Sequence, residues 1–510
     1  MASTLRPSLW FPSRGLNTAQ PPHTISMNMA SAGLDVIVEE NTVLKPRPGY
    51  ADVNGTAVSA SPTLHSFGSL YLSSGTSYEL IGTSNGGIWS DESGTVTASI
   101  FDGLSTTQGF DFTQFLDTVI ILDGTNIPQT WTGTATGTIS AAATAAKYGD
   151  THLEKFFISG ISANRSRVDY SQTGDFNTWT GAGTDQFNVA QNNGQIITGI
   201  KSFARNELVI FKERSMYKLI GYDKPSFNLV TVDKTIGCID NRSIQNYKSS
   251  TSGGLMMFAF RDGIYAYDGN TPRKITSYIQ DFWDSVNKTR FQWVDSTLDV
   301  ERGRYLLTVS VGSGVLNTRI IVVDLLHPWE DENGLHFPIW IWRVSAQALH
   351  TEIVSSTNAE RLVIGGSADG KKSNFDTAFR ADDGVAVSSE VETGLMDFRD
   401  SIGREQCLRR MYSALEATTG NIKVATEVKD GDDWVCQETI ESSGDADSIG
   451  VDFQIGVSAI GLPEATFTAR TNIKARSRRI KVRYKQVSAT RTFALQSPVE
   501  FYTKPGGMRA

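Results

Sequence analysis

Short apolar runs separated by Gly-, Asp- and Asn-containing turns recur along most of the chain. In residues 208–221, LVIFKERSMYKLIG, two apolar segments flank a charged turn, which predicts a strand, a turn and a second strand. Similar segments begin at Tyr71, Val119, Phe156, Leu255, Arg304 and Arg361. Their successive steps of roughly 40 to 60 residues match the length of one four-stranded propeller blade.

An isolated hairpin cannot bury its apolar face in water, whereas hairpins arranged around an axis bury both faces of every blade. We therefore predict an all-β protein, a β-propeller of about six or seven irregular blades followed by a C-terminal β-sandwich-like domain. Because the steps are uneven, a set of unrelated hairpins in a long β-sandwich stays open as the alternative.

A change in composition near residue 390 predicts a domain boundary, since charged residues become more frequent there. The predicted organisation is an N-terminal extension over residues 1–60, a propeller over 61–390 and a C-terminal β domain over 391–510. One amphipathic helix is expected in SYIQDFWDSV, residues 277–286, with Ser277 available as its N-cap. Its apolar positions are Ile279, Phe282, Trp283 and Val286.

The charge balance excludes a protein that wraps nucleic acid by global electrostatics. Lys and Arg number 47 against 55 Asp and Glu, a net charge of −8. The three cysteines, Cys238, Cys407 and Cys436, have no metal-ligand spacing and are expected to be buried thiols. No segment has the apolar core of a signal peptide or of a membrane span, so we expect a soluble protein made in a cytoplasm.

One concentrated basic stripe stands out, in RRIKVRYK at residues 478–485. In a strand, alternation places four cations on one face: Arg479, Lys481, Arg483 and Lys485. The opposite face then carries Ile480, Val482 and Tyr484. The stripe is either a solvated face that blocks aggregation or a contact surface for an acidic partner or a phosphate backbone.

Two tryptophans form the other candidate protein interface. HFPIWIWRV places Trp340 and Trp342 on one side of a strand and Ile339 and Ile341 on the other. Packing in the blade core is the favoured interpretation, and a subunit contact is the alternative.

Catalytic signatures are missing from the sequence. GTSNG at residues 82–86 fits G-x-S-x-G, but the strand that we expect to follow argues against Ser84 as a nucleophile. The histidines lack metal-ligand spacing, and no P-loop or dinucleotide fingerprint occurs. We therefore predict no catalytic, cofactor or metal site and no enzyme activity. A propeller glycosidase would require convergent carboxylates in one cleft.

Three stretches together resemble the tail hub or nozzle proteins, also called packaged-DNA stabilisation proteins, of short-tailed bacteriophages. The first is NTVLKPRPGY, with an L-x-x-R-P-G pattern over Leu44, Arg47, Pro48 and Gly49. The second is VDYSQTGDFNTWTG followed by NELVIFKERSMYKLIGYD, and the third is DGIYAYDGNTPRKITSYIQDFW.

The resemblance implies a structural virion protein, assembled in the host cytoplasm, that forms a homo-hexameric ring in the phage tail. Its implied partners are the tail adaptor protein, the tail needle or plug, fibres or spikes, and double-stranded DNA that passes without sequence-specific binding. A conduit should not bind the polyanion it releases, so we expect the basic stripe to face a protein. The alternatives are a receptor- or glycan-binding tail protein and a propeller glycosidase.

Overall fold

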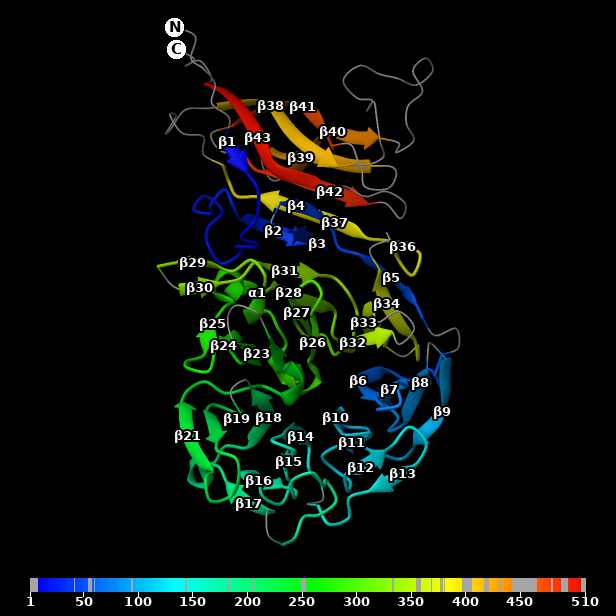
Figure 1. Cartoon of the computed structure of the whole chain (residues 1–510). Helices are drawn as coiled ribbons and strands as arrows, with labels where there is room; N and C mark the ends of the chain where they lie inside the picture. Colours follow the sequence, from blue (N-terminus) through cyan, green and yellow to red (C-terminus); the bar gives the residue numbers. More distant parts are fainter. Residues whose placement is uncertain are drawn as a thin grey trace.

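The computed structural model describes most of the chain (Figure 1). The described residues are 8–40, 42–53, 57–58, 60–92, 95–142, 145–181, 184–203, 206–248, 254–332, 334–354, 359–367, 369–376, 379, 381–396, 406–416, 422–430, 433–442, 466–477, 480–487 and 494–505.

Seven four-stranded antiparallel blades make up a β-propeller in the described part of the chain: five are separate sheets, and two are parts of larger sheets. Blade 1 has β6 (Leu64–Tyr71), β7 (Ser77–Thr83), β8 (Ile88–Glu92) and β9 (Thr95–Phe101). Blade 2 has β10 (Asp111–Phe115), β11 (Thr118–Leu122), β12 (Gln129–Trp131) and β13 (Thr136–Thr138). Blade 3 has β14 (Tyr148–His152), β15 (Lys155–Ser159), β16 (Arg167–Tyr170) and β17 (Asp185–Asn188). Blade 4 has β18 (Ile197–Phe203), β19 (Glu207–Lys212), β20 (Met216–Ile220) and β21 (Asn228–Asp233), and the single-turn η1 (Gln191–Asn193) precedes it.

The last three blades complete the ring. Blade 5 has β22 (Gln245–Tyr247), β23 (Leu255–Phe260), β24 (Gly263–Tyr267) and β25 (Arg273–Lys274), and follows η2 (Asn241–Ser243). Blade 6 has β26 (Asp295–Asp299), β27 (Arg304–Val309), β28 (Arg319–Asp324) and β31 (Ile339–Trp342). Blade 7 has β32 (Ala348–Val354), β33 (Ala359–Gly365), β34 (Lys372–Asp376) and β5 (Gly49–Asp52). The first strands of the blades lie around the axis, and β32 returns to β6. The predicted all-β propeller is thus confirmed.

Strand β5 closes the ring from the N-terminal side of the chain. It pairs antiparallel with β34, from Asp52 opposite Ser373 to Gly49 opposite Asp376. A Cβ at Gly49 would lie 2.2 Å from the carbonyl oxygen of Ala381, so only glycine allows this close approach. The end of the segment predicted as an N-terminal extension therefore belongs to the seventh blade. Beside β5, β35 (Ala381–Asp382) and β36 (Val385–Ala386) extend the same sheet.

A buried ion cluster joins blade 7 to blade 1 at the closure. The amine of Lys372 on β34 donates to Glu79 on β7 and to Asp91 on β8, and lies 3.2 Å from Glu352 on β32. Arg361 also pairs with Glu352. Burial and the neighbouring Glu352 raise the pKa of Glu79 well above its ordinary value, which favours the neutral form of this carboxyl.

The sheet of blade 6 continues into the C-terminal domain. Strand β2 (Ala30–Leu34) pairs parallel with β31 and antiparallel with β37 (Ser388–Thr393). The sheet then continues through β42 (Val482–Val487), β39 (Ile422–Asp430) and β40 (Asp433–Ser442). Figure 1 shows β2 and β37 between the propeller and the C-terminal strands. One nine-stranded sheet therefore runs from the propeller axis into the second domain.

A second sheet faces this one across the C-terminal domain. It contains β3 (Val36–Glu39), β4 (Val43–Pro46), β43 (Leu495–Pro505), β38 (Gln406–Glu416) and β41 (Thr466–Ser477), with β1 (Ser8–Trp10) paired to β43. Trp10 from this sheet stacks on Tyr484 from the other, with ring centroids 6.4 Å apart. The Tyr484 hydroxyl lies 2.7 Å from that of Ser413. The predicted sandwich-like domain is thus two packed sheets that include N-terminal strands.

The predicted helix is shorter than its pattern suggests. It comprises η3 (Ser277–Ile279) and α1 (Gln280–Asp284), and η4 (Lys288–Trp293) follows. Ile279, Trp283 and Val286 are buried as predicted. Ser277 is not the cap, because the turn begins one residue earlier at Thr276, which makes no capping side-chain bond. A small hairpin of β29 (Trp329–Asp331) and β30 (Gly334–His336) lies nearby.

Replacing Lys372 with Met should lower the free energy of unfolding by about 3–5 kcal/mol, because Asp91 and Glu352 would stay buried without their shared cation. Lys371→Met is the matched control, since the neighbouring amine is largely exposed and pairs with Asp52 at the surface. Urea unfolding of both variants measures the difference. Equal stabilities of the two variants would contradict this role for the buried cluster.

Candidate functional site

The arginine of the L-x-x-R-P-G pattern lies at the junction between the propeller and the N-terminal strands. Arg47 is 4% exposed, and its Nε donates to Asp35 at 2.8 Å while Nη1 donates to Asp382 at 2.8 Å. Arg343, just after β31, donates to the other oxygen of Asp35 at 2.6 Å. Asp382 is therefore part of a structural ion network, which explains why the pattern carries Arg immediately before the closing strand.

The basic stripe has its counter-charges within the same chain. Ile480, Val482 and Tyr484 are buried, and the cations alternate with them as predicted. Lys481 lies 2.5 Å from Glu392 on the neighbouring β37, and Arg483 lies 3.7 Å from Glu390. Arg479 lies outside the described residues, and Lys485 is half-buried on the same face. Cross-strand pairing leaves little positive charge here to attract an acidic partner.

The two candidate interface tryptophans belong to the core, the interpretation that the sequence favoured. Trp340 and Trp342 are at most 1% exposed. The Trp342 indole donates to the carbonyl of Val36 at 3.1 Å, and Gly33 makes room for the Trp340 ring. Neither ring reaches the surface, so their role as a subunit contact is corrected to packing between blade 6 and the N-terminal strands.

A turn between blades 4 and 5 closes the propeller axis at one end. We call Asp240, Asn241 and Arg242 the axial plug. Asp240 accepts from Lys147 before blade 3 at 2.9 Å, and also from the main chain of Arg242 at 3.2 Å. This local bond caps η2 and fixes the direction of the turn.

The other two plug residues contact four further blades. Asn241 donates to Asp111 of blade 2 at 3.1 Å and accepts from Ile200 of blade 4 at 3.1 Å. Arg242 donates to the carbonyl of His65 in blade 1 at 2.7 Å and to that of Gln292, before blade 6, at 3.0 Å. The plug therefore ties most of the ring together and blocks the channel along its axis.

A cavity of about 450 Å³ occupies the rest of the axis. The plug forms part of its wall, and the lining reaches the C-terminal ends of the first strands, at Tyr71 in β6, Ile353 in β32 and Val300 just after β26. Its charged lining residues are Asp111, Lys201, Arg242, Asp295 and Glu360. The volume lies within the range of ligand sites, and polar and charged side chains make up much of the lining.

Two aspartates from different blades converge on this cavity. Asp111 Oδ2 accepts from the main-chain N–H of Gly149 at 2.8 Å, and Asp295 Oδ2 accepts from that of Leu349 at 2.9 Å. Burial raises the pKa of Asp111 to about 6 and that of Asp295 to about 7. Asp382 of the ADDGV segment, residues 381–385, is not available for glycosidase chemistry, because it pairs with Arg47.

Lys201 and His350 are two further titratable groups in the cavity lining. The Lys201 amine lies 3.6 Å from Asp150, beyond hydrogen-bond distance, and nearby carboxylates raise its pKa. His350 contacts the Ser69 hydroxyl at 2.6 Å, and burial lowers its pKa to about 4, so it is neutral at pH 7. The cavity thus combines carboxylate acceptors with two cationic donors, Lys201 and Arg242.

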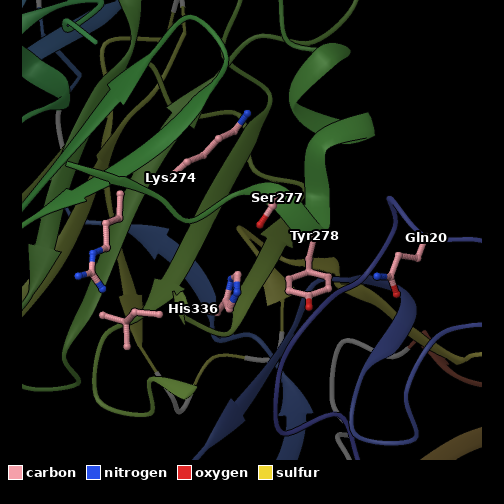
Figure 2. A pocket seen from close by; sticks show the side chains of 7 residues that line it. Gln20, Lys274, Ser277, Tyr278 and His336 are labelled. Carbon is pink, nitrogen blue, oxygen red and sulfur yellow. The ribbon is translucent and has the colours of Figure 1, made fainter. Parts of the chain in front are cut away.

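A second cavity, of about 550 Å³, lies outside the ring near α1 and is shown in Figure 2. Its lining comprises Gln20, Arg273, Lys274, Ser277, Tyr278, Leu335 and His336. Tyr278 lies beside His336, and both bind Asp331, at 2.6 and 2.9 Å. Burial and Asp331 raise the pKa of Tyr278 to about 12. These polar groups hold one another and the β29–β30 hairpin in place.

Searches for other chemistry within the described residues give two negative findings. In that part of the chain, no group of three or more His, Cys, Asp or Glu side chains could hold a metal ion. None of its helices is long and apolar enough to cross a bilayer. Cys238 is a buried thiol as predicted, and burial raises its pKa to about 12. The side chains of Cys407 and Cys436 lie outside the described residues.

Asp295→Asn should make the protein more stable at pH 8 by about 2 kcal/mol. The folded state keeps the Asp295 proton up to about pH 7, whereas an unfolded chain releases it near pH 4, so the free energy of unfolding falls between these values. Asn keeps the acceptor for Leu349 but has no proton to lose.

Chemical denaturation at pH 8 and at pH 4.5 measures the effect, which should shrink at the lower pH. Asp117→Asn is the control, because hydrogen bonds from Ser73 lower the pKa of this exposed group, and it should show no gain at pH 8. If Asp295→Asn lowered the free energy of unfolding at pH 8, ionisation of the buried Asp295 could not be what destabilises the wild-type protein at this pH.

Comparison with known proteins adds likenesses of fold only. No protein-family model and no curated protein matches the chain. The C-terminal WD40 domain of Sif2 is 12% identical, covers 68% of this chain and 96% of its own, and has a TM-score of 0.38. The computationally designed Ika8 protein is 11% identical, covers 64% of this chain and 100% of its own, and has a TM-score of 0.37. These values carry no argument about function, and the seven blades described above identify the propeller.

Proposed function

We propose that the protein is a structural subunit of a ring-shaped tail nozzle in a short-tailed phage. In this role it extends the DNA channel below the portal and adaptor and helps to retain and deliver the genome. The three stretches that resemble the nozzle family support the proposal, and Arg47 and Gly49 of the first stretch have defined structural roles at the ring closure.

The observation that carries the proposal is the nine-stranded sheet. A tube subunit must resist shear between its parts, and a continuous main-chain ladder transmits load better than a flexible linker. Buried residues from both domains, including Trp10, Trp340 and Phe501, also belong to one apolar core. The propeller and the C-terminal domain are therefore rigidly connected, which suits a structural role.

The axial plug determines where DNA would pass in such a ring. Because Asp240, Asn241 and Arg242 close the propeller axis, the conduit must form between copies rather than through one propeller. The proposed assembly is a homo-hexamer with the adaptor, the needle or plug, and fibres or spikes as neighbours. The net charge of −8 favours release of DNA over adhesion.

Electron microscopy of the purified protein and of virion tails tests the assembly. A hexameric ring with a central hole is the expected image, and the virion tail should contain the same ring below the portal. A protein that stays monomeric at high concentration and is missing from purified virions would overturn the proposal.

Exchanging the charges of Lys481 and Glu392 should leave ring assembly unchanged, because the pair between them is kept, although the new lysine at position 392 loses the contact of Glu392 with Arg483. Lys481→Glu alone should lower the melting temperature by a few degrees, since it adds a carboxylate beside Glu390 and Glu392. Thermal unfolding and microscopy of both proteins check this. A charge-exchanged protein that folds normally but fails to form rings would show that the basic stripe is a subunit contact.

A further inference from the structure

We propose that the central cavity binds the terminal sugar of a saccharide chain, a neutral polyhydroxylated ligand. This binding function goes beyond the proposed role in assembly and does not depend on it.

The shape of the cavity favours the terminal sugar of a saccharide over an internal one. The axial plug closes one end, and the cavity lining reaches the C-terminal ends of the first strands at the other. Its volume of about 450 Å³ is at the small end of typical ligand sites. A site with a single mouth admits the end of a chain, whereas an internal segment needs a groove that is open at both ends.

The polar groups match vicinal hydroxyls, each of which can donate and accept a hydrogen bond. Asp111 uses only Oδ2 for its two bonds, to Gly149 and Asn241, and the described residues supply no partner to Oδ1. Lys201, one blade beyond Gly149, has donors to spare because its contact with Asp150 is 3.6 Å long. A carboxylate acceptor and an ammonium donor that line the same cavity are suited to a pair of adjacent hydroxyls.

The charge balance argues for a neutral ligand. Asp111, Asp295 and Glu360 face Lys201 and Arg242 across a small polar space, and His350 is uncharged at pH 7. A strongly charged ligand of either sign would meet like charges at short range in a poorly solvated site. Hydroxyl groups can bind to both signs without adding a charge.

An apolar wall completes the site. Phe67 and Phe112 line the cavity and are half-buried, so their rings retain exposed surface. A Cβ at Gly68 would lie 2.5 Å from Phe112, and glycine at this position therefore lets the Phe112 side chain lie against β6. The C–H face of a sugar ring packs on such surfaces while its hydroxyls face the carboxylate and the amine.

Saturation-transfer-difference NMR with the full-length protein tests the proposal. The probes are the methyl glycosides of glucose, galactose, mannose, rhamnose and N-acetylglucosamine, with β-cyclodextrin as a sugar ring that has no chain end. We expect transfer to at least one methyl glycoside, strongest on the C–H protons of one ring face, and none to β-cyclodextrin. Longer linear oligosaccharides of the binding sugar should gain little affinity beyond the first two residues if a chain end is recognised.

Lys201→Met keeps the apolar stem and removes the donor, so the dissociation constant should rise at least tenfold. Lys224→Met is the matched control, because this lysine is exposed and pairs with Asp185 outside the cavity, and its affinity should equal that of the wild type. If Lys201→Met does not fold, as judged by circular dichroism, Asp111→Asn replaces it. No transfer to any methyl glycoside, equal binding of β-cyclodextrin, or wild-type affinity in the folded cavity variant would each overturn the proposal.

Discussion

The structure depends on main-chain pairing between the N-terminal strands and partners that lie hundreds of residues away. Strand β5 supplies the fourth strand of blade 7, β2 joins blade 6 to β37, and β1 and β4 flank β43. Without β5 the last blade would present an unpaired edge to water, and without β2 the two domains would share no ladder. The N-terminal strands therefore both close the ring, through β5, and attach the second domain, through β2.

Buried charge marks the places where distant segments meet. Lys372 holds three carboxylates between the last and first blades, Arg47 holds two aspartates at the domain junction, and Arg242 reaches two blades from the axial plug. The charged groups lose their hydration on burial, so each ion cluster as a whole contributes little net stability compared with an apolar replacement of all its members, although removal of the cation alone is costly. In this chain each cation contacts segments that are far apart in sequence, which favours one arrangement of the blades over competing ones.

The fold was largely predictable from the sequence, because the hairpin pattern and its interval report the burial of alternating side chains. The alternation in RRIKVRYK likewise gave the buried face of β42 correctly. The pairing of Lys481 with Glu392 could not be predicted, since it depends on which strand lies beside it. The two tryptophans show the same limit, because alternation defines a face but does not show what covers it.

The central cavity escaped prediction for a related reason. Asp111, Lys201 and Asp295 each lie in or at the start of the first strand of a blade, and their convergence exists only after the ring closes. Asp240 and Asn241 have the composition of an ordinary turn, and nothing local indicates that this turn points inward. The sequence did hold one indication of the cavity, namely polar residues that recur in the first strand of successive blades.

The long separation between paired strands also has a consequence for biosynthesis. Gly49 leaves the ribosome long before Asp376, its partner, and at ~5–20 residues per second the delay is on the order of tens of seconds. During that interval the nascent β5 has no ladder to join, while the intervening blades can already begin to form. The native fold can therefore form only after β34 and the later strands have been synthesised, and not when any single blade emerges.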